Sequence, residues 1–141
     1  MASLETILDD FAFLDDWEDR YRYVIELGEA LPPFPDEERN AANKVPGCVS
    51  QVWLTTEQGP GSDPVVTFTG DSDAHIVRGL VAIMLALFSG RTASEIQKTD
   101  AEATLKALGL DEHLSPQRAN GLRSMVKRIK RDAEMALKQT A

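Results

Sequence analysis

The stretch VVTFTGDSDAHIVRGLVAIMLALFSG, residues 65–90, decides the fold of this chain. Its first part, Val65–Gly70, is rich in β-branched and aromatic residues, which favour a strand. A helix is predicted to follow, capped by Ser72 or Asp73 and ended by Gly90, because glycine tolerates the left-handed conformation found after many helices. Apolar residues cover more than one face of this helix, so we expect it to form the core.

A second strand and a long loop precede this stretch. Val49–Thr56 reads VSQVWLTT, a composition that favours a strand, and the turn EQGPGSDP joins it to the strand at Val65. Two strands joined in this way are predicted to pair antiparallel as a hairpin. The preceding segment, PPFPDEERNAANKVPG at residues 32–47, has no apolar period and is predicted to be a loop. Loops of this length within one domain are often functional.

Helices are predicted on both sides of the hairpin. Residues 4–14 and 16–31 carry apolar side chains at helical spacing, and two short helices are expected between Thr92 and Leu110. The last helix is predicted to open at Ser115, with proline in its first position. With 141 residues and no repeat or linker, residues 1–141 should form one domain. The predicted fold class is α+β, with helices packed on a small antiparallel sheet.

Composition and charge exclude several classes of protein. The net charge of −8 argues against a nucleic-acid surface, although residues from Ser115 onward carry seven Lys or Arg against two Asp or Glu. This asymmetry fits either helix faces that neutralise one another or a docking surface for a protein. No apolar run is long enough for a membrane span and the N-terminus lacks the pattern of a signal peptide, so we expect a cytoplasmic protein. One cysteine and two histidines are too few for a zinc site.

The one cysteine of the chain, Cys48, lies in the sequence VPGCVSQVW. A lone cysteine is often an inert apolar residue, but Pro46 and Gly47 predict a tight turn that would place its sulfur at an accessible loop tip. A reactive thiol needs stabilisation of its thiolate. His75 or His113 could supply it through the fold, or Arg118 near the start of the last helix could do so. Each of these three residues could equally be a surface or capping residue.

Four segments resemble the SufE family of sulfur acceptor proteins. They are WEDRYRYVIELGEALP, VPGCVSQVW, GDSDAHIVRGL and LSPQRANGL, and they span nearly the whole chain. The resemblance implies that Cys48 accepts persulfide sulfur from a pyridoxal-phosphate-dependent cysteine desulfurase, SufS-like or CsdA-like, and relays it to an iron-sulfur scaffold. It also implies supporting roles for Arg118 and Asp73, and an α+β fold similar to IscU-like scaffold proteins. The cysteine is then expected on a surface loop that leans into an apolar pocket.

On this interpretation the protein is a sulfur carrier and desulfurase activator, not an enzyme. It needs no cofactor or metal of its own, and we expect a monomer when it is free. An alternative is a small thiol hydrolase in which His75 or His113 activates Cys48. A third possibility is an interaction module in which the thiol has no role.

Overall fold

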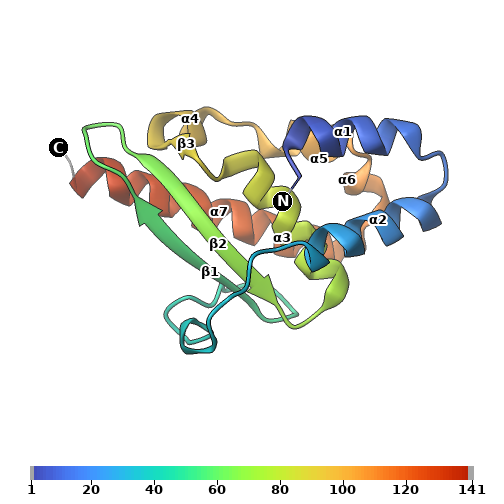
Figure 1. Cartoon of the computed structure of the whole chain (residues 1–141), viewed down its shortest axis with the longest axis horizontal. Helices are drawn as coiled ribbons and strands as arrows, with labels where there is room; N and C mark the ends of the chain where they lie inside the picture. The colour runs from blue at the N-terminus through green and yellow to red at the C-terminus, as the bar shows by residue number, and fades with distance from the viewer. Residues whose placement is uncertain (1, 140–141) are drawn as a thin grey trace.

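A three-stranded antiparallel sheet and seven α-helices make up the described residues, 2–139, of the computed structural model (Figure 1). The predicted single-domain α+β class is confirmed. The sheet order is β1-β2-β3. The elements are α1 (Leu4–Phe13), α2 (Trp17–Glu29), the 3₁₀ turn η1 (Asp36–Glu38), β1 (Val52–Gln58), β2 (Val65–Ser72), α3 (His75–Phe88), β3 (Arg91–Thr92), α4 (Ala93–Lys98), α5 (Ala101–Ala107), α6 (Leu110–His113) and α7 (Pro116–Gln139).

The hairpin of β1 and β2 is antiparallel, as predicted, but its boundaries differ. Val52 pairs with Ser72 at one end and Gln58 with Val66 at the other. The predicted start of β1 at Val49 is therefore wrong by three residues. The backbone hydrogen bonds of Gln51 go to Asp73, which follows β2, and to the hydroxyl of Ser72 at its end, so residues 49–51 stay in the loop that carries Cys48.

Helix α3 is the core of the molecule. Ten of its fourteen residues are buried, in agreement with its apolar composition, and Gly90 follows it with a φ of 84°. Its N-cap is Ala74, so the predicted cap at Ser72 or Asp73 is wrong. Gly79 lets α3 approach α2 closely, because a Cβ built there would lie 2.0 Å from the carbonyl oxygen of Val24.

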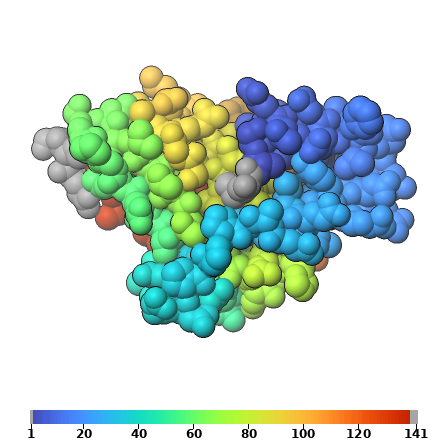
Figure 2. Space-filling view, viewed as in Figure 1, coloured from blue at the N-terminus to red at the C-terminus, as the bar shows by residue number. Residues whose placement is uncertain are grey.

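The longest helix, α7, runs behind the sheet and α3 (Figure 1). It opens after Ser115, whose hydroxyl accepts a hydrogen bond from the backbone N–H of Arg118. The loop before β1 forms a lobe at the lower edge of the molecule (Figure 2). No helix within residues 2–139 is long and apolar enough to cross a membrane.

Candidate functional site

The segment that carries Cys48, residues 42–51, is held beside the start of β1. The backbone N–H of Val45 donates to the carbonyl of Val52 at 2.8 Å, and Lys44 forms an isolated antiparallel bridge with Trp53. Gly47 then turns the chain with a φ of 86°, a conformation that favours glycine. The predicted Pro-Gly turn therefore exists, and it directs Cys48 toward α7.

Cys48 is half-buried against a cavity of about 370 Å³. Val77 and Leu80 of α3 and Met125 of α7 form an apolar wall of this cavity. The thiol lies 3.6 Å from the carbonyl oxygen of Gly121, to which it donates a weak hydrogen bond. Burial raises the pKa of the Cys48 thiol. The open loop tip expected from the turn residues is thus corrected: the resting thiol is sheltered, and it is neutral near pH 7.

Arg118 lines the same cavity as Cys48, from the first turn of α7. Its side chain is exposed, and within residues 2–139 its guanidinium makes no hydrogen bond or ion pair. The first turn of a helix also adds positive potential through its unpaired N–H groups. The structure therefore brings a free cation to the mouth of the cysteine cavity.

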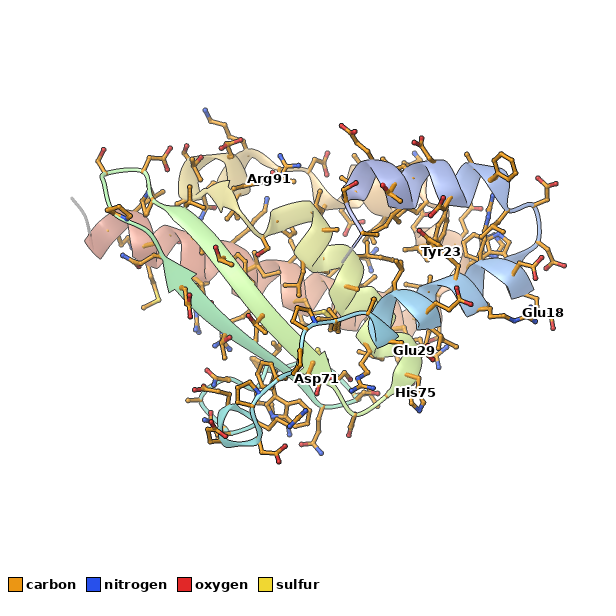
Figure 3. The ribbon with its side chains drawn as sticks, in the orientation of Figure 1. Glu18, Tyr23, Glu29, Asp71, His75 and Arg91 are labelled. Atoms are coloured by element: carbon orange, nitrogen blue, oxygen red, sulfur yellow. The ribbon has the colours of Figure 1, made fainter. Side chains whose placement is uncertain are left out.

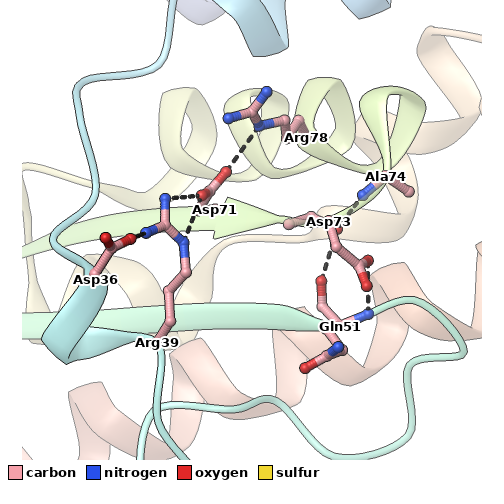
Figure 4. A network of polar contacts seen from close by, with 8 residues as sticks. Asp36, Arg39, Gln51, Asp71, Asp73, Ala74 and Arg78 are labelled. Carbon is pink, nitrogen blue, oxygen red and sulfur yellow. Dashed lines mark hydrogen bonds and ion pairs between the residues drawn. The ribbon is translucent and has the colours of Figure 1, made fainter.

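Asp73 lies outside the cavity, at the other end of the Cys48 segment. Its carboxylate accepts a hydrogen bond from the backbone N–H of Gln51 at 3.0 Å, and its own N–H donates to the carbonyl of Gln51 at 3.2 Å (Figure 4). The hydroxyl of Ser72 donates to that carbonyl at 2.7 Å. These two residues fix the end of the segment, which explains why neither caps α3.

Neither histidine lines the cavity of Cys48. His75 is exposed at the start of α3 (Figure 3), and the ring of His113 stacks on Trp17 with 3.9 Å between centroids. The carbonyl of His113 accepts a hydrogen bond from the hydroxyl of Tyr21. A Cys-His pair, which the hydrolase alternative requires, is therefore not assembled in the described part of the chain.

Most of the chain matches a known protein family. Residues 5–133 match the SufE family, described as an Fe-S metabolism associated domain. The chain belongs to the SufE family.

Two curated relatives of this SufE-family chain come from rhizobia, and both bear the name uncharacterized SufE-like protein. The relative from Rhizobium meliloti (strain 1021) is 64% identical over 135 residues, 95% of this chain and 96% of the relative. The relative from Rhizobium etli is 62% identical over 136 residues, 96% of this chain and 92% of the relative.

A solved structure has the same fold. The solution structure of a hypothetical protein from Thermus thermophilus has a TM-score of 0.75 with 20% identity, and the match covers 96% of each chain. Membership in the SufE family indicates a sulfur-related role in iron-sulfur metabolism, in a family of sulfur-transfer proteins that work with a cysteine desulfurase in general.

A buried ion-pair network that the sequence did not reveal joins the long loop before β1 to β2 and α3. Asp71, at the end of β2, has a side chain that is 7% exposed (Figures 3 and 4). Arg39 of the long loop donates to its Oδ2 at 2.7 and 3.1 Å, and Arg78 of α3 donates to its Oδ1 at 2.8 Å. Burial alone would raise the pKa of Asp71, but the hydrogen bonds from Arg78 and Arg39 outweigh it and hold the pKa below its usual value.

This network joins three elements that are distant in sequence. Arg39 also forms an ion pair with Asp36 and lies over the ring of Phe34, so the middle of the long loop is fixed to β2 and α3. In the sequence, the one local indication of this network is Asp71 itself, a charged residue directly after the strand-forming run VVTFTG. Within residues 2–139, no group of three His, Cys, Asp or Glu side chains could hold a metal ion.

Proposed function

We propose that this protein accepts sulfur on Cys48 from the persulfide of a pyridoxal-phosphate-dependent cysteine desulfurase, SufS-like or CsdA-like, and relays it for iron-sulfur cluster assembly. The observation that carries the proposal is the position of the single cysteine: it lies on a loop within the SufE match, half-buried against a cavity with an apolar wall. The protein then acts as a carrier and activator, a cytoplasmic monomer when free, and the desulfurase supplies the catalysis.

The transfer step balances without an oxidant or reductant. The Cys48 thiol loses its proton, and the thiolate attacks the outer sulfur of the desulfurase persulfide. A new Sγ–S bond forms while the S–S bond of the donor breaks. The thiolate of the desulfurase leaves with the electron pair of that bond and takes up a proton. The product is a persulfide on Cys48 and a regenerated thiol on the desulfurase.

The cavity supports storage of the transferred sulfur. Its volume of about 370 Å³ beside the thiol is ample for one additional sulfur atom. Its apolar wall would keep water and other thiols from the persulfide, which a second thiol could otherwise reduce. Arg118 at its mouth would stabilise the negative charge of thiolate or persulfide. Cys48 is the one cysteine of the chain, so no second thiol of the same molecule can intercept the sulfur.

Intact-mass measurement after incubation with a desulfurase and free cysteine tests the proposal. We expect one added sulfur atom on the peptide that contains Cys48, and a rise in desulfurase turnover when the protein is added. Cys48→Ser should show neither effect while retaining the fold. A protein that stays unmodified beside an active desulfurase would overturn the proposal.

A further inference from the structure

The Cys48 segment follows one face of α7. Ala42 and Lys44 meet Arg128, Gly47 meets Ser124, and Cys48 meets Gly121. The three helix residues are spaced by three and four positions, so they lie on the same side of the helix. The chain that delivers the thiol is therefore seated along α7 as well as paired with β1.

Arg128 is a largely buried contact on this face. Its side chain is 11% exposed, and its two terminal nitrogens donate to the carbonyls of Lys44 and Ala42, both at 3.3 Å. The third nitrogen donates to Asp132 at 3.3 Å, and the same carboxylate oxygen accepts a hydrogen bond from the hydroxyl of Thr56 on β1 at 2.8 Å. Asp132 thus orients the guanidinium and links it to the sheet.

The geometry of the segment leaves the carbonyl of Lys44 in need of a hydrogen-bond donor from outside the sheet. Val45 and Asn43 direct their hydrogen bonds toward β1, so the carbonyl of Lys44, between them, points away from the sheet. Arg128 satisfies that carbonyl. Gly47 then packs tightly, because a Cβ built on it would lie 2.6 Å from the hydroxyl oxygen of Ser124.

We propose that Arg128 is a positioning residue for Cys48: by holding the carbonyls of Ala42 and Lys44 it seats the segment that places the thiol in its cavity. That Arg128 matters for sulfur transfer rests on the proposed function. Its effect on the position and burial of the thiol does not. Arg128 does not line the cavity of Cys48. Among the described residues, Arg118 is the charged residue that lines it. Loss of Arg128 would therefore act on the thiol through its burial, not through direct charge.

Alkylation of the free protein by iodoacetamide tests the positioning role, and the single cysteine makes the reaction specific to Cys48. We expect Arg128→Met to react roughly three- to tenfold faster near pH 7, with the midpoint of its pH profile shifted down toward that of an ordinary thiol. Arg123→Met is the matched control, since Arg123 lies on the same helix, is exposed, and has an ion pair with Glu102 but no hydrogen bond to the segment. It should react like the parent protein.

A second variant keeps the proposal testable if Arg128→Met does not fold. Arg128→Lys retains the charge but cannot hold both carbonyls in the fixed geometry of a guanidinium, so we expect a smaller increase in rate. Parent-like alkylation rates and pH midpoints in the folded Arg128 variants would overturn the proposal.

Failure of this inference is distinguishable from failure of the proposed function. Alkylation requires no desulfurase, so a faster reaction of Arg128→Met supports the positioning role even if Cys48 never acquires sulfur. Conversely, sulfur on Cys48 together with an unchanged alkylation rate in that variant would overturn the positioning role and leave sulfur transfer standing.

Discussion

At the scale of single residues, the unusual feature of Cys48 is that its reactivity is lowered in the resting structure. Burial raises its thiol pKa, and the thiol sits beside a cavity instead of facing solvent. Its neighbour Val49 is the exposed residue, with 77% of its surface accessible. A thiol sheltered in this way is less accessible to stray oxidants.

The raised pKa predicts how stability varies with pH. Because folding keeps the thiol protonated, its contribution to the free energy of unfolding is complete below the ordinary thiol pKa of about 8.5 and is lost as pH rises above it. Chemical denaturation from pH 7 to 10 should show the parent losing stability relative to Cys48→Ala across this window. A constant difference between the two proteins would contradict a buried, perturbed thiol.

Asp71 predicts a second effect at the same scale. Asp71→Asn leaves Arg39 and Arg78 without their shared carboxylate, and we expect a loss of about 1–3 kcal/mol in the free energy of unfolding, because both arginines are partly exposed. The control is Asp36→Asn, which removes the other partner of Arg39 at a site that is 97% exposed and should cost less than about 1 kcal/mol.

The pH dependence of the Asp71 contribution has the opposite sign from that of Cys48. The lowered pKa of its carboxyl means that the stabilisation is present above the ordinary Asp value of about 3.9 and is lost as pH falls through the folded-state value. The free energies of unfolding of the parent and Asp71→Asn, measured between pH 2 and 7, should therefore converge at the acidic end. Curves that stay parallel would argue that the carboxylate charge contributes little.

At the scale of elements, the contact between the Cys48 turn and α7 decides where the thiol lies. Gly47→Ala adds strain at a φ of 86° and a Cβ close to Ser124, so we expect a loss of about 1–3 kcal/mol and faster alkylation of Cys48. Gly61→Ala is the matched control, because Gly61 has a φ of 98° but no atom near its Cβ position. It should lower stability through strain alone and leave the alkylation rate of Cys48 unchanged.

At the scale of the whole molecule, the basic helix α7 lies beside the cysteine while the N-terminal helices are acidic. Lys127 and Arg131 line a cavity next to Pro46 and Gly47, and Arg118 lines the cavity of Cys48. The charge asymmetry seen in the sequence therefore becomes a cationic surface around the proposed reaction site. For the proposed sulfur transfer, such a surface favours a partner that is acidic near its persulfide.

This surface predicts that sulfur transfer depends on salt. The rate of sulfur transfer, measured with this protein at a limiting concentration, should fall about three- to tenfold from low to high ionic strength. Lys127→Glu should lower this rate at low salt. Lys106→Glu, which makes the same charge change on α5, should have little effect, because Lys106 lines a different cavity with Arg20. Equal effects of the two variants would contradict local steering.

Local patterns predicted the elements better than their ends. The strand at Val65, the buried helix after it and the stop at Gly90 follow from residues that are neighbours in the chain. The start of β1 and the cap of α3 were wrong for one shared reason. Ser72 and Asp73 bond to Gln51, more than twenty positions earlier, and this long-range contact outweighs their local tendency to cap a helix.

The sequence by itself determined the fold class, the family resemblance and the single thiol, because periodicity, turn residues and short motifs act over a few neighbouring positions. Only the tertiary structure decided how that thiol is held. Arg39 meets Asp71 across 32 positions, and Arg128 meets Lys44 across 84. Pairings of this kind depend on how β1, α3 and α7 pack together, and burial, which sets the pKa of Cys48, exists only after they have packed.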